Sequence, residues 1–127
     1  KDLQELGLLQ CEPGDGARFS TLDEYVLWRA EMAMAQGCDG LIASGKYVKM
    51  FRDRFGEEAI IVSPGVRPAG QDTHEHQRSL TPFEAIQDGA DYLVVGRPIR
   101  DANNRREAAQ RIQDDIALPL KSDPGKI

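Results

Sequence analysis

The chain has 127 residues and a formal net charge of −5, so it is long enough to form one ordinary domain with a buried core. The acidic balance argues against proteins that bind nucleic acid or a membrane surface, because those show a basic face. No apolar run approaches the roughly 20 residues that span a bilayer. Cys11 and Cys38 show neither metal spacing nor a disulfide framework, which favours a reducing, cytoplasmic compartment.

The first predicted helix begins after Thr21, because Thr21 and Glu24 have the spacing of a capping box. We expect it to run to about residue 36 and to end at Gly37, in the left-handed position that follows many helices. Apolar residues at helical spacing predict one buried stripe along it. The stripe consists of Leu22, Tyr25, Trp28 or Arg29, and Met32.

Strands and helices alternate along the rest of the chain. Strands are predicted over 39–43 and 59–63, with a helix over 47–55 between them that ends at Gly56. A second capping box, Thr81-Pro82-x-Glu84, opens a short helix, and a third strand begins at Asp91. The last helix is expected over about 105–116, with a loose tail from about 118. Three strands and about five helices in this order predict an α/β domain over 1–127 with a parallel sheet.

The third strand leads directly into a candidate anion site. Its residues 93–95 are apolar and are followed by Gly96, Arg97 and Pro98. Glycine lets a ligand approach the backbone closely, and the arginine fork suits phosphate oxygens. Pro98 is expected at the first position of a helix, whose amino-terminal end favours anions. This combination predicts a phosphate site.

The preceding strand ends in the same way. Residues 60–63 are followed by Pro64, Gly65, Arg67 and Pro68, and a long loop without hydrophobic period extends to residue 80. Loops of that length in a compact domain are usually functional or mobile. The carboxyl ends of neighbouring parallel strands lie at one edge, where β/α barrels often bind phosphate. We therefore expect Arg67 and Arg97 at the same edge of the sheet.

Three motifs, in this order and spacing, resemble orotidine 5'-phosphate decarboxylase of the bacterial type. They are Ser63-Pro64-Gly65-Val66-Arg67-Pro68, then Gln77-Arg78-Ser79-Leu80-Thr81-Pro82, then the run from Gly89 to Ile99. Residues 37–44 resemble the sixth strand of that family, and residues 1–7 resemble the helix after its fifth strand. The resemblance covers essentially the whole chain but only the second half of the enzyme. It implies the C-terminal half of a TIM-type (β/α)8 barrel.

The resemblance also implies roles for individual residues. Arg97 and the backbone N–H of Gly96 would hold the substrate phosphate, Gln77 would reach from the long loop to the phosphate and the pyrimidine, and Arg67 would lie near the phosphate. The backbone of Pro64 would border the pyrimidine ring. Other readings stay open: a surface ion pair for Arg97, a packing glycine at 96, an exposed amide at 77 and a bracing arginine at 67.

In the long loop the sequence departs from the family pattern. The family shows Asp-Gln-x-Arg, whereas this chain has His76-Gln77-Arg78, and the stretch from Arg67 to Gln77 is about one residue longer than usual. His74 and His76 invite a metal reading, but the resemblance implies no metal and an exposed loop tip is the expectation. The path of this loop is therefore open, while Gln77 keeps its assignment.

Two aspartates and a lysine are expected to serve structure. Asp39 and Asp91 each begin a strand, on the face opposite the active site of a β/α barrel, so we interpret both as structural. Ser44-Gly45-Lys46 lacks the rest of a phosphate-loop motif, and Lys46 is interpreted as an early helix residue near the mouth of the barrel.

The catalytic motif of the resembled family does not occur. The chain contains no Asp-x-Lys-x-x-Asp, and it begins at Lys1 within an apparent helix, which suggests the C-terminal part of a longer protein. No catalytic residue is therefore assigned, and the chain alone is expected to be inactive. The resemblance implies a homodimeric enzyme that converts orotidine monophosphate to UMP without metal or organic cofactor. Two alternatives remain: another sugar-phosphate barrel, such as a ketogulonate-phosphate decarboxylase or a ribulose-phosphate epimerase, and a non-catalytic phosphate-binding or assembly half-barrel.

Overall fold

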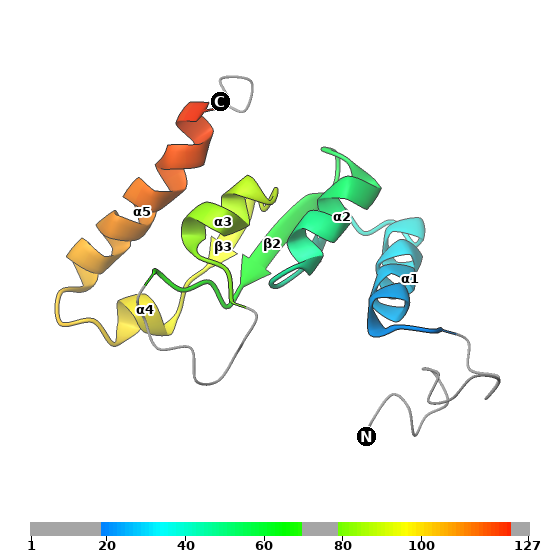
Figure 1. Cartoon of the computed structure of the whole chain (residues 1–127), viewed down its shortest axis with the longest axis horizontal. Coiled ribbons are helices and arrows are strands. Elements are labelled where there is room, and N and C mark those ends of the chain that lie inside the picture. Colours follow the sequence, from blue (N-terminus) through cyan, green and yellow to red (C-terminus); the bar gives the residue numbers. More distant parts are fainter. Residues whose placement is uncertain (1–18, 70–78, 123–127) are drawn as a thin grey trace. The chain divides into compact units, whose positions relative to one another are not determined.

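The computed structural model describes residues 19–69 and 79–122. Two compact units divide the chain, one over residues 1–39 and the other over residues 40–127 (Figure 1). The first unit contributes a single helix to the described residues, and the second contains the sheet with the remaining helices. No helix within these described ranges is long and apolar enough to cross a membrane.

The first unit contains helix α1 (Leu22–Ala35), which begins where the capping pattern predicts. Thr21 Oγ1 accepts the N–H of Glu24 at 3.1 Å, while the Glu24 carboxylate accepts the N–H of Ser20 at 2.8 Å. The side chain of Glu24 thus reaches one residue further back than in a standard capping box. At the other end Gly37 has φ +92°, which confirms the predicted left-handed residue after the helix.

The buried stripe predicted for α1 is wrong at both of its ends. Leu22 and Met32 are 37% and 47% exposed, whereas Tyr25 and Trp28 are half-buried. Phe19 packs against both aromatic residues, with ring centroids 5.4 Å from Tyr25 and 5.2 Å from Trp28. Within the described part of its own unit, this aromatic contact covers only the middle of the stripe.

The second unit is built on a parallel sheet of three strands in the order β1 (Gly40–Ile42), β2 (Ile60–Pro64) and β3 (Tyr92–Val94). The alternating parallel pattern predicted from the sequence is confirmed. Ile42 lies beside Val62, and Val62 lies beside Tyr92, so these three residues form one row across the sheet. Pro64 lies beside Val94 in the next row.

Helices α2 (Tyr47–Phe55) and α3 (Pro82–Gln87) cover one face of this sheet (Figure 1). Val48 and Phe51 are the buried residues of α2, and Ala85 is fully buried in α3. Alternate residues of β2, Ile61 and Ser63, are both 0% exposed and so lie on the covered face. The hydrophobic core of the unit lies between the helices and this face.

Helices α4 (Arg97–Arg100) and α5 (Arg105–Ser122) complete the second unit. α5 packs against α3 and buries Ile112. The expected helix end at Ile116 is wrong, and so is the loose tail expected from about 118 as far as Ser122, because α5 continues to that residue. The rest of the expected tail lies outside the described residues. Residues 117 and 118, alanine and leucine, are strong helix formers that carry the helix forward.

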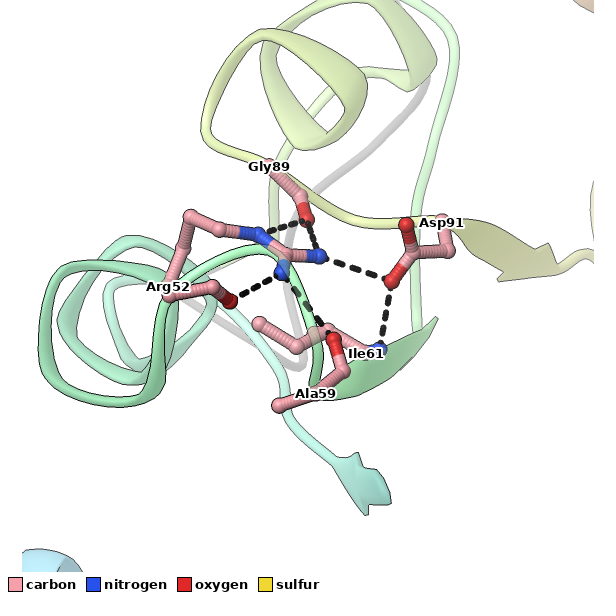
Figure 2. Close-up of polar contacts among 6 residues, drawn as sticks. Arg52, Ala59, Ile61, Gly89 and Asp91 are labelled. Carbon is pink, nitrogen blue, oxygen red and sulfur yellow. Dashed lines mark hydrogen bonds and ion pairs between the residues drawn. The ribbon is translucent and has the colours of Figure 1, made fainter. Parts of the chain in front are cut away.

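Arg52 of α2 joins the helix layer to the amino-terminal end of the sheet (Figure 2). Its Nε and Nη2 donate to the carbonyl of Gly89 at 3.0 and 2.8 Å, and its Nη1 donates to the carbonyls of Gly56 and of Ala59, the latter at 3.0 Å. The Arg52 side chain is 9% exposed. A guanidinium has five N–H groups, and with the bond to Asp91 described next all five are used.

Asp91 continues this network into the two strands. Its Oδ2 accepts from Arg52 Nη2 at 2.7 Å and from the backbone N–H of Ile61 at 2.7 Å (Figure 2). The backbone N–H of Asp91 in turn donates to the carbonyl of Ile61 at 2.9 Å. The structural role predicted for Asp91 is thereby confirmed, and one carboxylate fixes β2, β3 and α2 to each other.

Candidate phosphate site

The two candidate segments leave the sheet side by side. Because Pro64 pairs with Val94, the chain after β2 and the chain after β3 leave the sheet at the same end, where the carboxyl ends of the strands lie. Gly65 has φ +74°, a left-handed conformation that β-carbon-bearing residues rarely adopt, and it turns the chain immediately after β2. Arg67 therefore follows within three residues of one strand end, and Gly96 and Arg97 follow within three of the other. The sequence prediction that both arginines come from one edge is consistent with this register.

A hydrogen bond holds the backbone of Arg67 at the base of the long loop. Its N–H donates to the carbonyl of Leu80 at 2.9 Å, which brings together the two ends of the loop. Val66 is 3% exposed and anchors the segment in the core. On the far side, Thr81 begins α3 with the full capping box predicted from the sequence, including the reciprocal bond from Glu84. Arg67 is thus held in place by its own neighbours, with a half-buried side chain.

Gly96 is exposed, and packing against described protein atoms does not require glycine at this position. A Cβ built on Gly96 would meet no described atom within 4 Å, and the backbone has φ −104° and ψ −98°, which is neither helical nor extended. Tight packing, the alternative explanation for this glycine, is therefore not what the described residues show. Space remains directly above the backbone, which is the condition for close approach of a ligand.

Arg97 begins α4 as its first residue, so Pro98 occupies the second helical position and not the first as predicted. Gly96 is the N-cap, and its carbonyl accepts the N–H groups of Ile99 and Arg100 at 3.1 and 3.0 Å. The helical turn thus begins one residue earlier than expected, because these two bonds already close around Gly96. The side chain of Arg97 is exposed at this edge of the sheet.

Further cations gather just beyond Arg97. Arg100 pairs with Asp101 through bonds of 2.6 and 2.8 Å, and Arg105 Nε donates to the carbonyl of Arg100 at 3.0 Å. The pKa of Asp101 is lowered, chiefly by its hydrogen bond with Arg100, and Arg97 and Arg105 contribute through their charges. Arg100 contacts this carboxylate, and Arg97 and Arg105 act on it through their charges, so three arginines and one carboxylate gather at this end of the sheet in an acidic protein.

The structure places four of the five predicted site residues. Pro64, Arg67, Gly96 and Arg97 lie on the adjoining strand ends, whereas Gln77 lies outside the described residues, as do His74 and His76. Sequence reasoning missed the contribution of Arg100 and Arg105. The sequence does contain an indication of them, because four arginines fall within residues 97–106, after the third strand. A search for motifs does not consider such a local excess of one residue type. Among the described residues no group of three His, Cys, Asp or Glu side chains is arranged to hold a metal ion.

Comparison with known proteins identifies the family. Residues 12–112 match the model of the orotidine 5'-phosphate decarboxylase / HUMPS family. The chain belongs to this family. A curated orotidine 5'-phosphate decarboxylase from Methylococcus capsulatus is 46% identical over 116 residues, which are 91% of this chain and 44% of that protein. The enzyme from Nitrobacter winogradskyi is 39% identical over 97% of this chain and 47% of its own length.

Solved structures agree with the fold. The crystal structure of orotidine 5'-phosphate decarboxylase from Lactobacillus acidophilus matches with a TM-score of 0.64 and 33% identity, over 82% of this chain and 41% of that one. The Pyrococcus horikoshii enzyme matches with a TM-score of 0.60 and 30% identity, over 87% and 49%. The predicted TIM-barrel class is confirmed, and the chain spans about half the length of the decarboxylases it matches.

Proposed function

We propose that this chain supplies the phosphate- and nucleotide-binding half of an orotidine 5'-phosphate decarboxylase, which converts orotidine monophosphate to UMP in pyrimidine biosynthesis. Family membership supports the reaction class, and the adjoining ends of β2 and β3 support the binding role. Arg97 and the N–H of Gly96 bind the phosphate, and Arg67 adds a second cation from the neighbouring strand end. The backbone of Pro64 borders the pyrimidine, and Gln77 contributes from the long loop.

One observation carries the proposal. Gly96 sits between a strand end and an exposed arginine, and the space that its missing side chain leaves is open. Packing within the described residues does not account for a glycine there, because a Cβ at this position would meet no described atom within 4 Å. The open space suits a phosphate that contacts the backbone, and the surplus of arginine at the same end of the sheet supplies the matching charge.

The roles proposed for this half are binding roles. The sequence contains no Asp-x-Lys-x-x-Asp, so the reacting carboxylate of the substrate would meet residues from elsewhere in the enzyme. Energy from a remote phosphate grip can be used to stabilise the transition state, which is how a half without catalytic groups contributes to rate. The proposal includes a homodimeric, cytoplasmic enzyme without metal or organic cofactor, as the family resemblance implies.

The proposal is tested by calorimetric titration of the 127-residue chain with UMP and, separately, with uridine. We expect UMP to bind more tightly, because only UMP carries the phosphate. Arg97→Ala should weaken UMP binding by roughly 10- to 150-fold, since a hydrogen bond to a charged group contributes about 1.5–3 kcal/mol. Uridine binding should change little. Arg106→Ala is the matched control, because Arg106 is an exposed arginine on α5.

Gly96→Ala provides a second, independent test of the phosphate site. The added methyl group meets no described protein atom within 4 Å, so the variant is expected to keep the circular dichroism spectrum of the parent chain. It should nevertheless weaken UMP binding, because the methyl group would occupy the space of the phosphate. Equal affinities for UMP and uridine, or an Arg97→Ala variant that binds UMP like Arg106→Ala, would count against the phosphate site.

A further inference from the structure

One carboxylate lies among the arginines that follow β3. Residues 97–106 contain four arginines and one acid, Asp101, so the formal charge of this segment is +3, whereas that of the whole chain is −5. Such a local concentration of positive charge attracts anions to one end of an acidic protein. Asp101 opposes that attraction, and its contacts with the arginines determine how much positive charge remains for a phosphate.

Both carboxylate oxygens of Asp101 are bonded to Arg100. Arg100 Nε donates to Oδ1 at 2.6 Å, and Arg100 Nη2 donates to Oδ2 at 2.8 Å. This is the two-pronged geometry in which a guanidinium also binds a phosphate. The carboxylate therefore occupies the pair of N–H groups with which Arg100 could bind a second anion.

The same carboxylate lies within electrostatic range of two other arginines. Its pKa is lowered chiefly by the hydrogen bond with Arg100, and the charges of Arg97 and Arg105 lower it further. Hydrogen bonds explain why these groups are close. The N–H of Arg100 donates to the carbonyl of Gly96 at 3.0 Å, and Arg105 Nε donates to the carbonyl of Arg100 at 3.0 Å. Only one turn of chain thus separates Asp101 from Gly96, the proposed contact of the phosphate.

The fold does not depend on this ion pair. The side chains of Arg100 and Asp101 are 68% and 54% exposed, and exposed ion pairs contribute little to stability. Main-chain bonds hold α4 instead, among them the one from the N–H of Asp101 to the carbonyl of Arg97 at 3.0 Å. If the pair were an ordinary surface ion pair, removing the carboxylate would leave phosphate binding unchanged.

We propose that Asp101 is an internal counter-anion, which limits how tightly this end of the sheet holds the phosphate of a nucleotide. Without a nucleotide the carboxylate holds Arg100 and offsets the positive charge of Arg97 and Arg105. A nucleotide phosphate must compete with the carboxylate for these cations, so substrate and product are both held less tightly and the product dissociates faster. The inference rests on the phosphate site proposed above and gives Asp101 a positioning role.

The inference is tested by titrating the 127-residue chain and its Asp101→Asn variant with UMP and, separately, with uridine. Asparagine keeps the size of the side chain but removes its charge. At about 0.01 M salt, where the Debye length is about 30 Å, Asp101→Asn should bind UMP about 3- to 10-fold more tightly and uridine unchanged. The gain should nearly disappear at about 1 M salt, where the Debye length is about 3 Å. Stopped-flow dissociation of UMP should slow accordingly, and a damaged fold cannot produce such a gain.

A matched control and a second variant locate the effect. Asp114→Asn is the control, because Asp114 is an exposed aspartate on α5 that accepts from Gln110 at 3.0 Å, and it should leave both affinities unchanged. In an Arg100→Ala background, Asp101→Asn should gain less affinity, because the arginine that it releases is missing.

The outcomes separate this inference from the phosphate site itself. If Asp101→Asn gains no affinity for UMP relative to uridine, or if Asp114→Asn gains as much, Asp101 is not a counter-anion. Equal binding of UMP and uridine by the parent chain would instead count against the phosphate site proposed above. A preference for UMP that appears only in Asp101→Asn would still support the role of Asp101, because the carboxylate alone would then have blocked the phosphate.

Discussion

Replacing Arg52 should destabilise the second unit more than replacing any exposed cation of the same helix. Arg52 donates five hydrogen bonds, to three backbone carbonyls and to Asp91, and its side chain is only 9% exposed. Arg52→Met keeps a chain of similar length but removes every donor. The carbonyls of Gly89 and Ala59 then lose their charged partner in a partly buried position.

The expected loss follows from how well the remaining groups can be rehydrated. Removing one partner of a buried ion pair costs about 3–5 kcal/mol. Asp91 is 41% exposed and keeps its bond to the N–H of Ile61, which places the variant at the lower end of that range. We therefore expect Arg52→Met to lower the free energy of unfolding by about 3 kcal/mol. Arg52→Lys keeps the charge but only three donors, and should lose about 1–2 kcal/mol.

Urea denaturation of the 127-residue chain, followed by circular dichroism at constant m-value, measures these losses. Lys49→Met is the matched control, because Lys49 lies on the same helix and pairs with Asp53 while both side chains are more than 60% exposed. Exposed pairs of this kind contribute about 0.3–0.5 kcal/mol. Hydrogen exchange at the N–H of Ile61 adds a local measurement, since that group donates to the Asp91 carboxylate.

The reasoning is refuted if Arg52→Met and Lys49→Met unfold within about 0.5 kcal/mol of each other, which is the scale of a surface ion pair. It is also refuted if Arg52→Lys is as damaging as Arg52→Met, because the charge and three donors would then contribute nothing. A loss confined to exchange at Ile61, without a change in global unfolding, would restrict Arg52 to a local role in joining β2 and β3.

Three further changes test the second unit. Thr81→Ala removes the cap of α3 and should lower the free energy of unfolding, measured by urea denaturation, by about 1 kcal/mol. Hydrogen bonds from the backbone and side chain of Thr81 lower the pKa of Glu84 below 4.5. The loss of stability should therefore become smaller as pH falls through that lowered pKa. Burial raises the pKa of Asp88 above 3.8, so ionisation of its carboxylate reduces stability as pH rises through the raised pKa. Asp88→Asn should therefore stabilise the chain by about 0.3–1 kcal/mol at pH 7 but not at pH 3. The fully buried Ser63 hydroxyl has no hydrogen-bond partner among the described residues, so Ser63→Ala should leave the free energy of unfolding unchanged or raise it by up to about 1 kcal/mol. Ser44→Ala is the control, because Ser44 is exposed. A loss of stability above about 1 kcal/mol in Ser63→Ala would show that the hydroxyl is hydrogen-bonded.

Helix boundaries were largely predictable because their signals are local. The Thr81 capping box, the left-handed Gly37 and the helix end at Gly56 all appear where the sequence places them. Each depends on residues within about one turn, so no knowledge of distant contacts is needed. α5 was underestimated because Pro119 suggested an end, yet the helix continues to Ser122.

The contacts that fix the sheet could not be predicted in the same way. Arg52 lies 37 residues from Gly89 and 39 from Asp91, and nothing in the local sequence distinguishes it from Arg54 two positions later. Only the folded arrangement shows that one of these arginines is enclosed by carbonyl groups while the other is exposed. The prediction that Asp91 is structural was confirmed, but its partner was not foreseen.

The sequence could predict that the candidate residues share one end of the sheet, but not which other cations lie near them. A glycine and an arginine after each of two consecutive parallel strands must reach the same edge, because all parallel strands end on one side. That geometric rule located Arg67, Gly96 and Arg97 without a structure. The surrounding charge of Arg100 and Arg105 depends on the turn between α4 and α5, which carries no recognisable motif.

We expect stability and binding to be separated along β3. Asp91 precedes the strand and is held by Arg52, whereas Gly96 and Arg97 follow it at the opposite end. In β/α barrels the amino-terminal face serves stability and the carboxyl-terminal face serves the reaction. Arg52→Lys should therefore weaken the fold but leave the affinity for UMP within about threefold once the protein is folded, which is less than about 0.7 kcal/mol. Arg97→Ala should do the reverse. If Arg52→Lys weakened UMP binding as much as Arg97→Ala, the two ends of the strand would be coupled, and the phosphate site would depend on the whole sheet.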